Sequence, residues 1–255
     1  MTTAAVAIIC KTPEAGKSKT RLSPPLTPAQ CAELSACFIR DLAANLADLA
    51  ADGRVVGHAL YTPAGSEARL SRLLPTPFGL VLQSDGDLGA RLDAGIRDLL
   101  ALGHGAAIIV SSDSPTLPRA SFAAAVDRLL AEDCVVLCPA LDGGYTFIGL
   151  SRPHPELFAD MPWSTADVHR LTVERARAIG LTVHEVPMWY DVDDRETLAV
   201  LRADLAGEPL PFACDGAARM PAPTTAAWLA RLDDSATPAF APAFVATPAE
   251  RRVAR

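Results

Sequence analysis

Lysine is scarce in this sequence of 255 residues, which contains 20 arginines but only three lysines, Lys11, Lys17 and Lys19. A bias toward alanine and arginine explains why lysine is rare, but not why all three lie in one short segment. The chain also lacks an excess of positive charge, because 30 acidic residues outweigh 23 basic ones and give a net charge of -7. This balance argues against a general nucleic-acid or anionic-membrane binder. The compact basic segment is therefore the first functional lead.

Other absences exclude further classes of protein. No apolar run approaches the ~20 residues that cross a bilayer, and no basic region precedes the apolar run 4–10, as a secretory signal requires. The six cysteines show no C-x-x-C spacing, so we expect reduced thiols in a cytoplasmic protein. Half of the residues are apolar and 21% are charged, a composition typical of a globular domain.

Strand-like and helix-like segments alternate along most of the chain. Strands are predicted at 6–10, 55–61, 80–83, 106–111, 135–139, 146–150 and 181–186, and helices at 28–49, 67–74, 88–102, 119–131, 167–179 and 194–205. Repeated β-α-β order of this kind predicts an α/β fold with a mainly parallel sheet that helices flank on both sides.

The composition changes after Leu205. Residues 206–255 hold seven of the 21 prolines and carry no net charge. We therefore predict a folded domain over 1–205 and a Pro/Ala-rich C-terminal tail over 206–255, with one short helix near 226–232.

The basic segment, Lys11 to Leu22, directly follows the first predicted strand. Open parallel sheets bind ligands at the carboxyl ends of their strands, and several cations with backbone amides suit a di- or triphosphate. We therefore assign donor phosphate binding to Lys11, Gly16, Lys17, Lys19, Thr20 and Arg21, with Lys19 and Arg21 as the main contacts. The segment is not a P-loop, because the first glycine is missing and Pro24 and Pro25 block the helix. A solvated loop with incidental charge is the alternative.

Two acidic segments are candidates for a metal site. Asp113 ends the most apolar strand, where a carboxylate can hold a divalent cation against phosphates; a simple turn or cap is equally compatible with its position. Asp191 and Asp193 would face the same side of an extended segment and could reach one ion. Asp194 is expected to cap the next helix.

Two glycine-containing turns complete the set of candidates. Asp142-Gly143-Gly144-Tyr145 reads as a hairpin turn, or as a place where Asp142 or Tyr145 contacts an acceptor. Asp87 is either a helix N-cap or part of a donor site beside Arg91. The sequence has no Cys/His spacing that suggests zinc and no G-x-S-x-G of serine hydrolases.

Taken together, these segments resemble a bacterial family of GT-A-like transferases of unknown function, described as radical-SAM/selenodomain-associated glycosyltransferases. The resemblance extends over about residues 4–204. It rests on K-x-P-x-x-G-x-x-K-T-R-L at 11–22, D-L-G-x-R-L at 87–92, S-D-S-P at 112–115, D-G-G-Y at 142–145, W-S-T at 163–165 and D-V-D at 191–193. Cys138 departs from the family, which usually has glycine before this proline.

The resemblance implies a GT-A-like, Rossmann-like fold of the nucleotide-diphospho-sugar transferase type, related to guanylyltransferases of cofactor biosynthesis. It also implies a nucleotide donor, Mg²⁺ or Mn²⁺ as cofactor, and metal ligands at Asp113, Asp191 and Asp193. Our candidate catalytic residues are Asp113, Asp142 and Asp191, and Tyr145 and Trp163 are candidates for contacting the acceptor.

The expected function is therefore metal-dependent transfer of a sugar from a nucleotide-sugar to a small-molecule acceptor. Nucleotidyl transfer from an NTP, with release of pyrophosphate, is the alternative that the basic segment favours. A nucleotide-binding module without catalytic activity is a third possibility. The sequence identifies neither the sugar, the base, the acceptor nor the oligomeric state.

Overall fold

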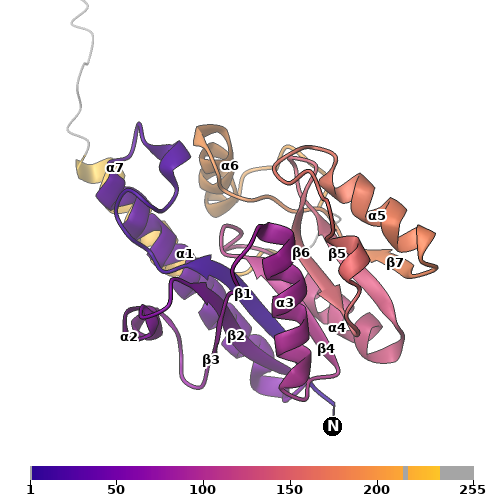
Figure 1. Cartoon of the computed structure of the whole chain (residues 1–255). Coiled ribbons are helices and arrows are strands. Elements are labelled where there is room, and N and C mark those ends of the chain that lie inside the picture. Colours follow the sequence, from indigo (N-terminus) through magenta and orange to yellow (C-terminus); the bar gives the residue numbers. More distant parts are fainter. Residues whose placement is uncertain (1, 215–217, 236–255) are drawn as a thin grey trace, which may run out of the picture.

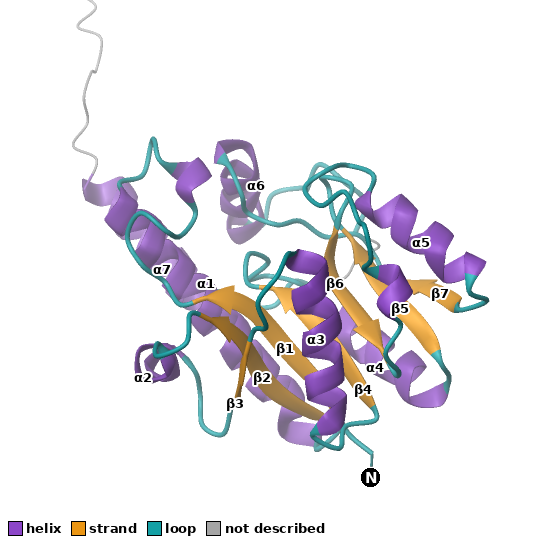
Figure 2. Cartoon of the chain, in the orientation of Figure 1, coloured by secondary structure: helices purple, strands orange, loops and turns teal. Residues whose placement is uncertain are grey.

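A seven-stranded sheet in the order β3-β2-β1-β4-β6-β5-β7 forms the centre of the computed structural model, which describes residues 2–214 and 218–235 (Figures 1 and 2). The strands are β1 Ala4–Lys11, β2 Val55–Thr62, β3 Gly79–Leu82, β4 Ala106–Ser111, β5 Cys134–Pro139, β6 Tyr145–Leu150 and β7 Thr182–Glu185. Strand β6 runs antiparallel to β4 and β5, whereas the other pairings between the named strands are parallel. The predicted mainly parallel sheet is confirmed.

Helices cover both faces of the sheet and enclose two hydrophobic cores. They are α1 Pro28–Leu49, α2 Glu67–Leu70, α3 Leu88–Ala101, α4 Arg119–Ala131, α5 Val168–Ala178, α6 Arg195–Ala206 and α7 Pro223–Ser235. Apolar side chains of α1, α4, α6 and α7 pack in the larger core, and those of α3 and α5 pack in the smaller core on the opposite face. Residues on β1 and β4 alternate between the two cores, as expected for strands buried on both faces.

Capping explains why two of the helices begin where they do. Thr27 and Gln30 form the predicted capping box of α1, with Pro28 in its first turn, and Asp194 forms a capping box with Thr197 at the start of α6. Such boxes satisfy backbone donors that the first turn of a helix leaves free. The expectation that Asp194 caps a helix is confirmed.

The antiparallel strand β6 follows from the Asp142-Gly143-Gly144 turn. The Asp142 carboxylate accepts a hydrogen bond from the Gly144 amide at 2.9 Å, and Gly143 has a φ of +87°. A Cβ at Gly143 would lie 2.3 Å from the Ala166 carbonyl oxygen, so this close approach requires glycine. The turn joins β5 to β6 as a hairpin, in agreement with the sequence-based interpretation.

The helix predicted near 226–232 is present as α7, which lies beside α1 (Figure 1). The Asp41 carboxylate on α1 accepts hydrogen bonds from the amides of Thr224 and Thr225 at 3.0 and 2.7 Å. The Trp228 indole donates to Glu33 at 2.9 Å. A carboxylate at the start of a helix is favourable because it meets free amides and the positive end of the helix dipole. The rest of the predicted tail, 236–255, lies outside the described residues.

Two further findings bear on the sequence-based expectations. All six cysteines are free thiols, and all except Cys214 are buried. Within the part of the chain that the structure describes, no helix is long and apolar enough to cross a membrane.

Candidate active site

The candidate residues lie at the carboxyl end of the sheet, where β1 and β4 end side by side. Ile9 of β1 is opposite Ser111 of β4 in the parallel register. The loop after β1 therefore begins next to the Ser112-Asp113 turn that follows β4. Adjacent parallel strands bring together two segments that are far apart in the sequence.

Lys19 connects the basic loop to both acidic segments. Its ammonium lies 2.7 Å from Asp113 Oδ1 and donates to the Val192 carbonyl, also at 2.7 Å. The side chain is only 4% exposed, and its ammonium lies 4.7 Å from the centre of the Phe38 ring. Lys19 also has a positive φ of 46°, which is unusual for a residue with a side chain. Lys19 is therefore a fixed internal cation rather than a mobile surface charge.

Hydrogen bonds hold the two acidic segments together. The Val192 amide donates to the Asp113 carbonyl at 2.9 Å, and the Ser114 hydroxyl donates to Asp191. The residue before Asp191, Tyr190, is fully buried and donates to Asp204 of α6 at 2.7 Å. The aspartates thus project from a segment that is anchored in the core, so their positions are fixed in advance.

Burial and mutual repulsion affect the ionisation of these carboxylates. Burial raises the pKa of Asp191 to about 7, opposed by the hydrogen bond from Ser114 and assisted by the charges of Asp113 and Asp193. Burial and the neighbouring Asp113 also raise the pKa of Asp193, although Lys19 and Arg21 act in the opposite direction. Burial thus favours the protonated, neutral form of these carboxyl groups, and a cation beside them would favour the carboxylate.

A cavity of about 270 Å³, which we name the basic cavity, opens between the loop after β1 and the start of α3. Four predicted phosphate ligands line it together with Asp113: Lys11, Lys17, Lys19 and Arg91. Lys17 is 68% exposed and pairs with Glu14 at 2.8 Å, so its ammonium can exchange a surface partner for a ligand. The structure thus brings together four of the five cations that the sequence assigned to a phosphate site, but not Arg21, which the sequence analysis named as a main contact.

The other predicted phosphate ligands do not line the basic cavity. Gly16 and Thr20 are exposed residues of the loop after β1. The Arg21 guanidinium lies 3.9 Å from the Asp193 carboxylate. Asp87 accepts a hydrogen bond from the Ala90 amide at 2.9 Å as the N-cap of α3. The helix-cap interpretation therefore accounts for Asp87 without a ligand.

A second cavity of about 250 Å³, the aromatic cavity, lies on the other side of Ser111. Its walls include the predicted residues Asp142, Tyr145, Trp163 and Asp191. Ile9, Leu88 and Ser111 line both cavities, which therefore adjoin. Asp113 faces the basic cavity and Asp191 faces the aromatic one, so the acidic segments lie between two compartments of different chemistry.

The three predicted metal ligands are neighbours but do not form a tight group. Among the described residues, the group of three or more ligand atoms that lie within 4.8 Å of one another is Glu132, Cys134 and His184, at a different place in the fold. In the acidic site, the Lys19 ammonium lies next to Asp113 instead. The donor set consists of carboxylate oxygens, which suit a hard cation such as Mg²⁺ or Mn²⁺.

The structure also identifies residues that sequence reasoning did not single out. Gln83 donates to the carbonyls of Cys10 and Leu60 at 3.0 and 2.8 Å, and thereby joins the ends of two strands below the basic cavity. Gly89 allows the Trp163 loop to approach α3, because a Cβ there would lie 2.6 Å from the Phe158 carbonyl oxygen. Both belong to the segment with the D-L-G-x-R-L pattern, but only the spatial neighbours reveal their roles.

Comparisons with known proteins agree with this fold. Residues 44–165 match the model of a family described as an uncharacterized protein conserved in bacteria (DUF2064). A solved structure described as a "putative nucleotide-diphospho-sugar transferase" from Desulfovibrio desulfuricans G20 is 28% identical. It has a TM-score of 0.78, with 92% of this chain and 96% of that chain covered. No curated protein matches the sequence.

More distant structures share the fold alone. A cytidylyltransferase from Leptospira borgpetersenii is 10% identical, with a TM-score of 0.54 and coverage of 92% of this chain and 95% of that chain. A CMP:2-keto-3-deoxy-manno-octonic acid synthetase complexed with CTP is 11% identical, with a TM-score of 0.53 and coverage of 80% and 99%. The chain has the fold of the nucleotide-diphospho-sugar transferases. The resemblance to a GT-A-like family of unknown function is confirmed.

Proposed function

We propose that this protein is a metal-dependent glycosyltransferase that moves a sugar from a nucleotide-sugar to a small-molecule acceptor. The observation that carries this proposal is the pair of adjoining cavities, one lined by cations and the other by aromatic residues, with carboxylates between them. Group transfer needs a donor and an acceptor held in contact. The description of the structure from Desulfovibrio desulfuricans as a nucleotide-diphospho-sugar transferase supports the same class.

The metal would be Mg²⁺ or Mn²⁺, held by Asp113 and Asp193 with Asp191 beside them. Burial raises the pKa of Asp191 and Asp193, and a divalent cation bound beside them would oppose that shift by favouring the carboxylates. Such an ion takes one or two carboxylates and substrate phosphates as ligands. When bound, it would supply charge stabilisation at the leaving phosphate.

The basic cavity would hold the donor phosphates. Lys17 and Arg91 line it together with Lys11 and are positioned to contact phosphate oxygens. Lys19 has a different role in this proposal: it fixes Asp113 and the Val192 backbone in place through its two 2.7 Å contacts. The loop would thus both bind the donor and organise the acidic segments.

The aromatic cavity would hold the acceptor. The Trp163 side chain lines this cavity, although its indole N–H is buried against Gly89 and has no hydrogen-bond partner among the described residues. Tyr145 and apolar side chains line the same cavity, which favours an acceptor with one apolar face. Asp142 and Asp191 also line it, and either carboxylate could accept the proton of the attacking hydroxyl.

Nucleotidyl transfer is the second candidate, because four cations line the basic cavity. Such a set suits the triphosphate of an NTP at least as well as the diphosphate of a nucleotide-sugar. The two reactions release different by-products. Glycosyl transfer releases a nucleoside diphosphate or monophosphate, whereas nucleotidyl transfer releases pyrophosphate.

The test is to incubate the purified protein with Mn²⁺, panels of nucleotide-sugars and NTPs as donors, and a panel of small molecules with hydroxyl or phosphate groups as acceptors, and to assay each by-product. We expect nucleoside phosphate from at least one nucleotide-sugar and no pyrophosphate from any NTP. Pyrophosphate release from an NTP would assign the protein to the second candidate. Nucleotide binding without any turnover would indicate an inactive nucleotide-binding module.

A further inference from the structure

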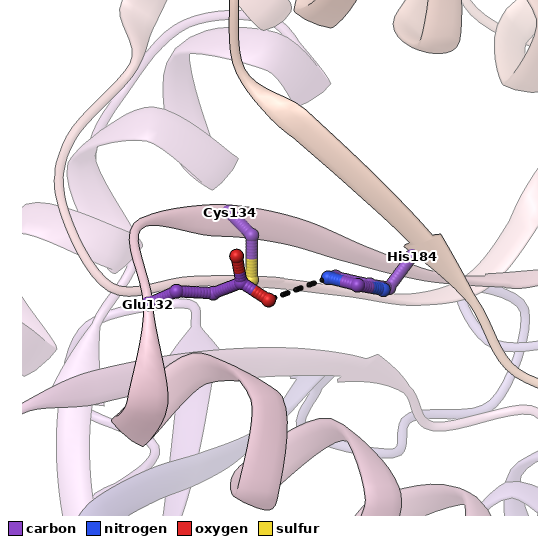
Figure 3. Close-up of side chains that lie close together, drawn as sticks. All are labelled: Glu132, Cys134 and His184. Atoms are coloured by element: carbon purple, nitrogen blue, oxygen red, sulfur yellow. Dashed lines mark hydrogen bonds and ion pairs between the residues drawn. The ribbon is translucent and has the colours of Figure 1, made fainter.

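Three side chains of different chemistry meet at the amino end of the sheet, away from the candidate active site. Glu132 ends α4, Cys134 begins β5, and His184 lies on the edge strand β7 (Figure 3). Their ligand atoms all lie within 4.8 Å of one another. Figure 3 shows the Glu132 carboxylate reaching toward the His184 ring, with the Cys134 sulfur beside it.

The register of the sheet explains this convergence. Cys134 is opposite Thr182 and Val136 is opposite His184 in the parallel pairing of β5 with β7. Since side chains alternate between faces along a strand, Cys134 and His184 are diagonal neighbours on one face. Glu132 lies two positions before Cys134 and reaches the same face, where its Oε1 is 2.9 Å from His184 Nε2.

The burial of the three groups leaves a site that is closed on one side and open on the other. Cys134 is fully buried, whereas the side chains of His184 and Glu132 are 26% and 43% exposed. An ion can therefore enter from solvent over Glu132 and His184 and reach the sulfur below. In the described ion pairs, no lysine or arginine contacts the Glu132 carboxylate. A metal ion would therefore not have to displace a lysine or an arginine from Glu132.

We propose that Glu132, Cys134 and His184 form a binding site for Zn²⁺. A thiolate, an imidazole and a carboxylate are the ligands that zinc takes, and three of them with one open position give a four-coordinate site. Mg²⁺ prefers oxygen ligands only, so this set selects a different metal from the acidic site. The bound ion would join the end of α4 and the start of β5 to the edge strand β7.

Zinc binding at this site releases the Cys134 thiol proton to solvent, and the Nε2 proton through which His184 meets Glu132 moves to Nδ1, or is also released if the ring is doubly protonated. Burial, together with the charges of Glu132 and Asp133, raises the pKa of Cys134 to about 11, so without metal the group is a thiol. The ion binds the thiolate, and metal affinity therefore rises with pH. An ion pair between Glu132 and His184, with no metal, is the competing explanation for the geometry.

Cobalt spectroscopy tests the proposal on the reduced, metal-free, full chain without an affinity tag. Titration with Co²⁺ should produce a near-ultraviolet sulfur-to-cobalt charge-transfer band and the visible bands of four-coordinate cobalt, and added Zn²⁺ should abolish both. Carboxylates alone give no such charge-transfer band, so binding of Co²⁺ at Asp113 or Asp193 is not mistaken for binding at this site.

Variants locate the site. Cys134→Ser should abolish the charge-transfer band, and His184→Gln or Glu132→Gln should weaken Zn²⁺ binding at least roughly 10- to 100-fold, a loss that even outer partners of metal ligands can cause. Cys214→Ser, which changes a half-buried thiol outside the cluster, is the matched control and should keep the band. If Cys134→Ser does not fold, the two partly exposed positions carry the test. No thiolate band in the wild type, or a band that survives Cys134→Ser or is unaffected by both other variants, would overturn the proposal.

Discussion

The two ends of the sheet differ in whether an opposite charge accompanies the buried polar groups. At the carboxyl end, burial raises the pKa of Asp191 and Asp193, but the Lys19 ammonium lies 2.7 Å from Asp113 and opposes the shift at Asp193. At the amino end, burial keeps the imidazole of His58 and the thiol of Cys134 neutral by shifting their pKa values. The basic cavity at the carboxyl end presents the cations that a charged ligand such as the proposed donor phosphates would contact. At the amino end, His58 gains a charge only when the pH falls, and Cys134 loses its proton only when the pH rises or a metal ion binds.

The largest expected effect comes from removing the carboxylate beside Lys19. Asp113→Asn keeps the shape of the side chain but removes a proposed metal ligand and the partner of a buried ammonium. We expect the transfer rate with Mn²⁺ to fall roughly 100- to 1,000-fold, as when one group that stabilises developing charge is lost. Asp98→Asn, an exposed position on α3, is the matched control and should retain the wild-type rate. Wild-type turnover by Asp113→Asn would show that the Asp113 carboxylate takes no part in the reaction.

The next effect separates the two neighbouring lysines of the basic loop. Lys19→Met leaves the carboxylates of Asp113 and Asp193 without their internal cation, and should lower the free energy of unfolding by about 2 to 3 kcal/mol. Lys17→Met removes an exposed charge and should change stability little, yet it should weaken nucleotide binding because Lys17 lines the basic cavity. Urea unfolding and calorimetric titration with a nucleoside diphosphate measure the two quantities. Equal stability losses would contradict the distinction between a fixed and a mobile lysine.

At the amino end, stability should depend on the ionisation of His58. Burial, assisted by His104, lowers the pKa of His58 from 6.5 to about 4, so the unfolded chain takes up the proton first as the pH falls. The contribution of neutral His58 to the free energy of unfolding is complete above pH 6.5. As the pH falls toward 4, on the order of 2 kcal/mol of this contribution is lost. The free energy of unfolding should fall more between pH 7 and pH 5 in the wild type than in His58→Gln, and His154→Gln should match the wild type. Unfolding curves at the two pH values measure this difference. If the free energy of unfolding of His58→Gln falls with pH as much as that of the wild type, His58 is not the cause of the pH dependence.

The last effect concerns the turn beside the aromatic cavity. Gly143→Ala forces a side chain into left-handed backbone and against the Ala166 carbonyl, which should cost about 1 to 3 kcal/mol. Gly207→Ala has a similar φ of +76° but nothing within 4 Å, and should cost less. Thermal unfolding compares the two variants. Equal losses would show that the Ala166 contact contributes nothing.

The sequence predicted the fold well because hydrophobic alternation and helix caps are local signals. Pro28 and Gln30 marked the start of α1, and the apolar run at 106–111 is strand β4 with the same bounds. The family resemblance implied that Asp113 and Asp191 belong to one metal site, and the structure places their segments side by side through the hydrogen bond from the Val192 amide to the Asp113 carbonyl. The internal pairing of Lys19 could not be predicted, because it depends on the backbone of Val192, which folds against it from the far end of the domain.

The cluster of Glu132, Cys134 and His184 is a second feature that local sequence patterns could not predict. No Cys/His spacing in the sequence indicated zinc, because Cys134 and His184 lie on separate strands and meet only through the pairing of β5 with β7. Local patterns therefore predict elements and loops. Contacts that depend on sheet register require the structure.

The most direct test of the central claim is calorimetric titration of nucleoside diphosphates, with and without Mn²⁺, into wild type and Asp113→Asn. If the carboxyl end holds a metal ion against donor phosphates, at least one nucleoside diphosphate binds the wild type more tightly with Mn²⁺ than without it. The same Mn²⁺ dependence should be lost in Asp113→Asn. Equal affinity with and without Mn²⁺, or an unchanged Mn²⁺ effect in the variant, would contradict the account.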